Sequence, residues 1–167
     1  MYEIIEPLST RILYLDTDSA IFVSREGEIE PELGPYLGQL TNELDAYGSG
    51  AYITKFLSGG PKFYSYQVKS ADNSIKTVCK VKGIRLNFRN SEKVNFESIE
   101  NLVEHSLDEL NILSNDYDAT NYKINLQFRA RRRTKEYEAI TVTESKTCTA
   151  VLKKRRFLTH SYSLPFG

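Results

Sequence analysis

The sequence predicts an α+β fold in which an antiparallel sheet packs with helices and is followed by a small β-rich region. Several short runs of β-branched and aromatic residues alternate with turn residues, which is typical of hairpins. One segment, from Asn95 onward, repeats apolar residues at helical spacing. The tail from Tyr122 to Leu152 is rich in Thr, Val, Ile, Tyr and Arg, which indicates two or three further strands.

The first predicted element is a hairpin with an acidic tip. Two short apolar runs, Ile12–Leu15 and Ala20–Val23, flank the polar tetrad Asp16-Thr17-Asp18-Ser19. Carboxylates separated by one residue project to the same side of an extended chain, so Asp16 and Asp18 can together hold a hard cation. Magnesium binds through one or two carboxylates plus substrate phosphates, and a turn of this kind therefore suits nucleotide chemistry.

A helix and three strands are expected next. Apolar residues recur at helical spacing between Gly34 and Gly48, which predicts a helix of about three turns. These residues are Tyr36, Leu37, Leu40, Leu44 and Tyr47. The predicted strands are Tyr52–Leu57, Phe63–Val68 and Lys76–Val81, and the cluster Ser58-Gly59-Gly60-Pro61 ends the first of them.

The most regular helix of the sequence follows Asn95, which is a suitable N-cap. Its apolar positions are Phe96, Ile99, Val103, Leu107 and Leu110. Turn-forming Asn and Ser residues between Arg85 and Glu92 precede it. We therefore expect a division into residues 1–88 and 89–167.

The composition is that of a globular protein of one unit or two small lobes. The chain has 167 residues, of which 40% are hydrophobic and 26% charged. It has no apolar run long enough to cross a bilayer and no secretory signal pattern, so we expect an intracellular protein without a membrane partner, in the nucleus or the cytoplasm. Cys79 and Cys148 lack CxxC spacing and nearby histidines, which supports neither a disulfide framework nor a zinc site.

The net charge of zero hides an asymmetry. Residues 1–60 carry three basic and ten acidic side chains, whereas residues 61–167 carry nineteen and twelve. An acidic metal-binding end joined to a surface that follows a polyanion fits this split. Uneven surface charge without functional meaning fits it as well, and charge alone favours that explanation.

The Asp-x-Asp pattern also has several explanations. An EF-hand loop that began at Asp16 needs an oxygen ligand at its fifth position and Glu at its twelfth, where this chain has Ala20 and Gly27, so it is excluded. An aspartate-nucleophile phosphatase also carries Asp-x-Asp after an apolar strand. A plain Asx-type turn is the commonest outcome for such a pair. The isolated motif leaves the last two explanations open.

The full string from Tyr14 to Ser19 resembles the Tyr-x-Asp-Thr-Asp-Ser motif of family B DNA polymerases, which lies on a hairpin of the palm domain. The resemblance implies that Asp18 is the principal ligand of two catalytic Mg²⁺ ions and that Asp16 assists. It also places Tyr14 and Thr17 near the incoming nucleotide. Leu15 departs from the small residue often found at its position, which affects how closely the nucleotide approaches.

Two further motifs narrow the resemblance to the protein-primed type. Lys62-Phe63-Tyr64, after Gly60-Pro61, resembles the Lys-x-Tyr motif that binds the primer terminus, and both side chains share a face if the segment is extended. Lys80-Val81-Lys82-Gly83-Ile84 resembles the Lys-x-Lys-Gly-Ile/Val segment between palm and thumb. The resemblance implies that Lys62, Tyr64, Lys80 and Lys82 contact the primer strand. A solvated strand face is the alternative for the two lysines Lys80 and Lys82.

The resemblance extends in weaker form to Leu37–Leu44 and to Lys154–Gly167, which are similar to polymerases of self-synthesising DNA transposons and related viruses. It implies a palm-type sheet in residues 1–88 and a β-rich thumb in 89–167. In a thumb, Arg131 and Arg132 of the cluster Arg129–Arg133 would contact duplex DNA. A solvated basic edge that discourages strand aggregation is an equal alternative.

The implied function is DNA-directed DNA synthesis in a longer parent enzyme, with primer-template DNA and deoxynucleoside triphosphates as partners and a terminal protein as a further primer. The family's other palm motif, Asp-x-x-Ser-Leu-Tyr-Pro-Ser, and its fingers helix do not occur in this chain. Two-metal catalysis needs carboxylates from both palm motifs, so we expect the chain alone to be inactive. A non-catalytic DNA-binding or partner-binding module and an aspartate-nucleophile phosphatase are the alternatives.

Overall fold

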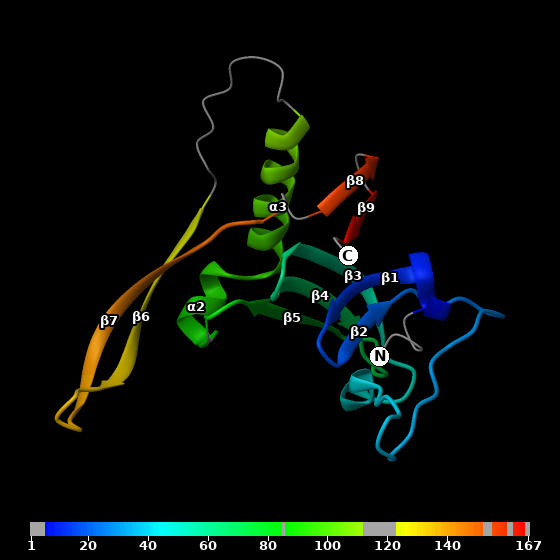
Figure 1. The fold of residues 1–167 in the computed structure, drawn as a ribbon, viewed down its shortest axis with the longest axis horizontal. Coiled ribbons are helices and arrows are strands. Elements are labelled where there is room, and N and C mark those ends of the chain that lie inside the picture. The colour runs from blue at the N-terminus through cyan, green and yellow to red at the C-terminus, as the bar shows by residue number, and fades with distance from the viewer. Residues whose placement is uncertain (1–5, 85, 112–122, 152–154, 160–161, 166–167) are drawn as a thin grey trace. The chain divides into compact units, whose positions relative to one another are not determined.

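The chain has a mixed α+β fold in which the strands pair mostly in antiparallel fashion and the helices are few (Figure 1). The computed structural model describes residues 6–84, 86–111, 123–151, 155–159 and 162–165. The elements in chain order are η1 (Ser9–Arg11), β1 (Ile12–Asp16), β2 (Ser19–Phe22), η2 (Glu43–Tyr47), β3 (Tyr52–Gly60), β4 (Phe63–Lys69), β5 (Ile75–Val81), α2 (Phe88–Lys93), α3 (Phe96–Asn111), β6 (Ile124–Arg133), β7 (Ala139–Cys148), β8 (Arg155–Thr159) and β9 (Tyr162–Pro165).

The chain packs as two compact units. The first consists of Met1–Thr54 and Val68–Lys76, and the second of Lys55–Gln67 and Thr77–Gly167. The expected α+β class is confirmed. The expected division at residue 88 stays a prediction.

The first unit contains the predicted hairpin. β1 and β2 pair in antiparallel fashion, with Asp16 opposite Ser19, and an irregularity between Ile12 and Tyr14 shifts the register. Beyond β2, the Val23 N–H donates to the Arg11 carbonyl at 2.9 Å, which continues the pairing past the strand end. The apolar runs on both sides of a short polar tetrad therefore form the hairpin that they predict.

Residues 34–48 do not form the predicted three-turn helix. Gly38 has a φ of +95°, which lies far outside the helical region and breaks the periodic segment in its middle. Tyr36 and Leu37 are 76% and 107% exposed, so the first part of the apolar repeat is not buried. Helical spacing without a buried face does not hold a helix together, and this segment keeps only the short 3-10 helix η2.

β3, β4 and β5 form a three-stranded sheet in that order. β3 continues through Ser58, Gly59 and Gly60, which the sequence assigned to a break, because these three residues are buried in the sheet. A Cβ atom at Gly59 would lie 2.6 Å from the Phe63 ring, so the missing side chain makes room for that ring. The chain reverses only at the next two residues, before β4.

α3 forms the predicted amphipathic helix, and its apolar face builds the core of the second unit. The Ser98 N–H donates to Asn95 Oδ1 at 2.9 Å, and the Asn95 N–H donates to Ser98 Oγ at 3.0 Å, which is reciprocal capping at the predicted start. The buried core cluster consists of Phe63, Val94, Ile99, Leu102, Val103, Leu126 and Cys148. The side chain of Leu110, predicted for the same face, lies outside the described residues.

The tail forms the predicted strands. β6 and β7 make a long two-stranded ribbon, paired from Ile124 opposite Cys148 to Arg133 opposite Ala139 (Figure 1). β8 and β9, which lie beyond the predicted tail, make a second antiparallel pair. The ends of the predicted β-rich tail, Tyr122 and Leu152, lie outside the described residues. Over the described ranges, no helix has the length and apolar character needed to cross a membrane.

Candidate functional site

The tip of the first hairpin is a strained two-residue turn. β1 ends at Asp16 and β2 begins at Ser19, so Thr17 and Asp18 make the turn. Thr17 has a φ of +44°, in the left-handed region that β-branched residues rarely adopt. Strain of this kind costs about 1–3 kcal/mol and persists only where the surroundings enforce it. The acidic motif therefore coincides with a backbone outlier.

Local hydrogen bonds hold this turn. The Thr17 hydroxyl donates to Asp16 Oδ1 at 3.3 Å, and the Ser19 hydroxyl donates to the Asp16 backbone carbonyl at 3.1 Å. Asp16 is half-buried and Asp18 is exposed, while Tyr14 is only 9% exposed. The tip thus presents one partly shielded carboxylate beside one that faces solvent.

The two carboxylates reach the tip by a route that differs from the sequence expectation. The spacing argument placed Asp16 and Asp18 on one extended segment, but the chain reverses at Thr17 between them. They share the tip because of the turn and not because of strand alternation. Among the residues that the structure describes, no three or more His, Cys, Asp or Glu side chains are grouped to hold a metal ion.

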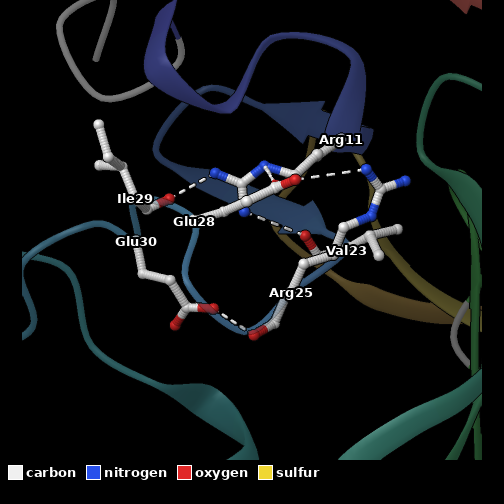
Figure 2. A network of polar contacts seen from close by, with 7 residues as sticks. Arg11, Val23, Arg25, Glu28, Ile29 and Glu30 are labelled. Carbon is white, nitrogen blue, oxygen red and sulfur yellow. Dashed lines mark hydrogen bonds and ion pairs between the residues drawn. The ribbon is translucent and has the colours of Figure 1, made fainter.

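A buried arginine anchors the base of the hairpin (Figure 2). Arg11 is 6% exposed, and its Nε lies 2.8 Å from the carboxylate of Glu28. One of its terminal nitrogens donates to the Val23 carbonyl at 3.3 Å, and the other donates to the Ile29 carbonyl. Arg11 therefore ties the end of the hairpin to the loop that follows β2.

Sequence patterns offer little indication that Arg11 anchors the hairpin. Arg11 precedes an apolar run and belongs to no motif, and a single arginine in such a place carries no pattern. The acidic spacing of Glu26, Glu28, Glu30 and Glu32 after the hairpin is the one available signal, since a buried arginine needs a carboxylate partner.

The predicted primer residues Lys62 and Tyr64 lie on different kinds of structure. Lys62 has a φ of +57° and occupies the turn between β3 and β4, whereas Tyr64 lies on β4. They are therefore not side by side on one strand, as an extended segment would place them. The turn exposes Lys62 at the end of the sheet, and Tyr64 is half-buried.

Tyr64 belongs to a row of aromatic rings on one face of the sheet. Its ring centroid lies 6.2 Å from that of Phe56 and 6.2 Å from that of Tyr66, with which it stacks at 12°. Phe63 and Ser65 alternate with these rings and face the other way, toward the core and Cys79. The aromatic row therefore lies on the sheet face opposite α3.

Lys80 lies on the same sheet face as the aromatic row, near the start of β4. The Ser65 hydroxyl donates to the Val78 carbonyl at 3.0 Å and lies 3.1 Å from Cys79 Sγ, which places the end of β5 beside the start of β4. Cys79 and Val81 pack against the core, so Lys80 between them projects from the opposite face and is exposed.

Lys82 lies beyond β5, in a turn. Gly83 has a φ of +70°, and the Ile84 N–H donates to the Val81 carbonyl at 3.0 Å, so the two lysines Lys80 and Lys82 do not extend along one strand as expected. The Lys146 ammonium donates to the Gly83 carbonyl, which connects this turn to the ribbon of the same unit. Lys82 itself is exposed.

The two predicted thumb arginines lie on opposite faces of the β6–β7 ribbon. Arg131 pairs with Thr141 and Arg132 with Ile140 in the register, and adjacent pairs face opposite ways. Arg132 binds Glu144, with Nε 2.7 Å and Nη2 2.5 Å from the same carboxylate oxygen. The structure therefore separates these residues and gives Arg132 an acidic partner within the ribbon.

Neither cysteine is poised as a nucleophile. Burial raises the pKa of the Cys79 thiol, and the Ser65 hydroxyl offsets this only in part. Burial likewise raises the pKa of Cys148, which lies in the core. Both thiols stay protonated at neutral pH, where a thiolate would be needed for nucleophilic attack.

The candidate residues therefore fall into two separate groups, one in each unit. Asp16 and Asp18 lie on the hairpin of the first unit, whereas the lysines, Tyr64 and the arginines lie in the second. The first group offers hard oxygen ligands, and the second offers cations at the end of a sheet and along a ribbon. No protein-family model, curated protein or solved structure matches this chain.

Proposed function

We propose that this chain is the palm-hairpin and thumb part of a DNA polymerase of family B, which acts in nucleotidyl transfer within a longer enzyme. The observation that carries the proposal is the folding of Tyr-Leu-Asp-Thr-Asp-Ser as a hairpin, with the strained Thr17 and the exposed Asp18 at the turn. A backbone outlier at a polar tip is a feature that functional sites retain. In this proposal the three-stranded sheet is the palm sheet and the ribbon belongs to the thumb.

The donor set of the tip fits Mg²⁺. Asp16 and Asp18 supply carboxylate oxygens at a solvent-facing turn, and magnesium keeps several waters while binding one or two carboxylates. When bound, such ions stabilise the attacking and leaving oxygens of a phosphoryl transfer. In this proposal Asp18, which is exposed, is the principal ligand, as the resemblance implies, and Asp16 assists from its partly shielded position.

The remaining residues position the substrates. Arg11 holds the base of the hairpin, so that the tip keeps its place during turnover. Lys62, Lys80 and Lys82 put exposed ammonium groups at one end of the sheet, where they neutralise primer phosphates. Tyr64 lies beside Lys80 on the same face and supplies a phenol to the primer terminus.

Primer extension tests this proposal. The assay needs a protein in which the motif Asp-x-x-Ser-Leu-Tyr-Pro-Ser stands upstream of this chain, because the chain itself does not contain it. Asp18→Asn should lower the extension rate at least about 100-fold, since it removes a charge aimed at the reacting phosphate. Asp72→Asn, at another turn of the same unit, is the matched control and should leave the rate unchanged. Full activity of Asp18→Asn would refute the assignment.

A second candidate function is nucleic-acid binding without catalysis, and the basic ribbon favours it. This candidate predicts that the upstream motif restores no extension while salt-dependent DNA binding remains. An aspartate-nucleophile phosphatase is excluded if the chain alone fails to hydrolyse a generic phosphate ester. Hydrolysis that Asp16→Asn abolishes would favour the phosphatase over both DNA-directed functions.

A further inference from the structure

The two faces of the β6–β7 ribbon differ in chemistry. Directly opposed residues of an antiparallel pair share a face, so the register sorts every side chain of the ribbon. One face carries Leu126 and Cys148 at the core end, and then Glu144 and Arg132, which bind each other. On this face, Leu126 and Cys148 are buried by packing, and Arg132 and Glu144 form an ion pair with each other.

The other face is exposed, and all of its residues except Ala139 are polar. Its β6 residues are Asn125, Gln127, Arg129, Arg131 and Arg133, and its β7 residues are Thr147, Ser145, Thr143, Thr141 and Ala139. The Thr147 hydroxyl donates to Asn125 Oδ1 at 2.8 Å across the strands, which agrees with this sorting. We call this face the arginine–hydroxyl face.

The arginine–hydroxyl face carries charge of one sign. Arg129, Arg131 and Arg133 follow one another at every second residue, a span of about 13 Å for four residues of strand. No described residue on this face of either strand is acidic. The Arg133 guanidinium lies 4.7 Å from the centroid of the Tyr137 ring, which orients it without neutralising it.

The combination of arginines with hydroxyls favours phosphate over other anions. Arginine offers a planar fork of donors that matches phosphate oxygens, and Ser and Thr hydroxyls are common donors to the nucleic-acid backbone. Among the strand residues of this face only Ala139 is apolar, so the strands offer no apolar row to a lipid bilayer. Duplex DNA carries about one charge per 1.7 Å of its axis, which is dense enough to engage all three arginines.

We propose that the arginine–hydroxyl face binds the phosphate backbone of duplex nucleic acid without reading its bases, and that Arg129, Arg131 and Arg133 carry the binding. In this proposal Arg131 contacts duplex DNA, as the sequence predicted, whereas Arg132 does not. Arg129 and Arg133 are added to the predicted set. The choice of nucleic acid as the partner rests on the proposed function. The choice of residues rests on the register of the ribbon.

The test measures the affinity of the full chain for duplex DNA as a function of salt, with labelled duplexes of about 20 base pairs and two unrelated sequences. Three neutralised phosphates contribute about 2.7 to the slope of log affinity against log salt, so the triple variant R129Q/R131Q/R133Q should have a slope shallower by that amount. Wild type should lose about 40-fold more affinity than this variant between about 50 and 200 mM salt.

A charge-matched variant separates position from net charge. R25Q/K76Q/R132Q removes the same number of positive charges from residues outside the arginine–hydroxyl face. It should keep the wild-type slope. The inference is overturned if both triple variants lose the same slope, if R129Q/R131Q/R133Q binds as wild type does, or if poly-glutamate binds as tightly as DNA.

Two further variants make the outcome specific. T141V/T143V removes hydroxyls but no charge, so it should weaken binding a few-fold at an unchanged slope, because neutral donors release no counterions. D16N/D18N in the presence of a chelator should bind DNA at least as tightly as wild type. The proposed function is refuted if no protein that joins the upstream palm motif to this chain extends a primer. If the slope still depends on the three arginines in that case, this inference stands.

Discussion

The Nε of Arg11 lies 2.8 Å from a carboxylate oxygen of Glu28, and this pair closes the base of the hairpin whose tip carries Asp16 and Asp18. Arg11 is buried, whereas the side chain of Glu28 is 40% exposed. Loss of Arg11 should therefore cost more stability than loss of Glu28, because Arg11 also donates hydrogen bonds to two backbone carbonyls. The pair connects a buried structural residue to the hairpin whose tip is the proposed metal site.

Arg11→Met should lower the free energy of unfolding by about 2–3 kcal/mol, because it leaves the carbonyls of Val23 and Ile29 without their donor. Glu28→Gln should cost about 1 kcal/mol or less, since its partner keeps the carbonyl bonds and solvent screens the pair. Urea unfolding of both variants measures the difference. Arg25→Gln, which removes an exposed partner of Glu28 at 3.4 Å, is the control and should change little. Equal losses for all three variants would contradict the anchoring role of Arg11.

Thr17→Gly should stabilise the protein by about 0.5–1 kcal/mol, because glycine adopts the φ of +44° without the clash of a β-branched side chain. The lost Thr17 hydroxyl bond is long, at 3.3 Å, and offsets only part of this gain. Thermal unfolding of wild type and Thr17→Gly measures this net gain in stability. Asn73→Gly, at a φ of +62°, should gain less, since asparagine already tolerates this region. A clear loss of stability in Thr17→Gly would show that the turn is not strained.

Leu126→Ala should cost about 3 kcal/mol, because Leu126 is fully buried and connects the ribbon to the core beside Ile99 and Leu102. Gln127→Ala changes the next residue, on the arginine–hydroxyl face, and should cost less than about 0.5 kcal/mol. Chemical denaturation of the two variants tests the sorting of faces on which the ribbon's proposed role depends. Similar losses at both positions would contradict that sorting.

The stability of the protein should fall at alkaline pH in part through its two thiols. Burial raises the pKa of Cys79 and Cys148 in the folded state, so the folded chain holds these protons to higher pH than the unfolded chain. The contribution of the two thiols to the free energy of unfolding is complete below the usual thiol pKa. It is lost as the pH rises above that value. Between about pH 8 and pH 10, wild type should lose more stability than Cys79→Ala/Cys148→Ala. A larger loss in the double variant would reverse the sign and contradict the burial of the thiols.

Segments with a partner to pack against were predictable from the sequence. The apolar face of α3 buries Ile99 and Val103, and its start is fixed by the reciprocal bonds of Asn95 and Ser98. The helical repeat around Leu37 looked equally regular, yet Tyr36 and Leu37 are exposed and Gly38 breaks it. Periodicity predicts a helix only where the fold supplies something to cover it.

The mutual placement of the motif residues was not predictable. Each motif was expected to set two side chains on one face of a strand, but a turn with a positive φ lies within or directly beside each pair, at Thr17, Lys62 and Gly83. Local turn chemistry decided these positions, because tight reversals at strand ends override the two-residue repeat. Arg11 belongs to no motif, and its role depends on carbonyls that only the folded chain brings near.

Mn²⁺, a paramagnetic substitute for Mg²⁺, should bind the hairpin tip, and the broadening of backbone amide resonances in the full chain measures where it binds. The broadening should be centred on residues 16–19, be reversed by excess Mg²⁺, disappear in Asp18→Asn and persist in Asp72→Asn. Broadening that is unchanged in Asp18→Asn, or that is centred on the glutamates of residues 26–32, would contradict the claim that the hairpin tip is the metal site.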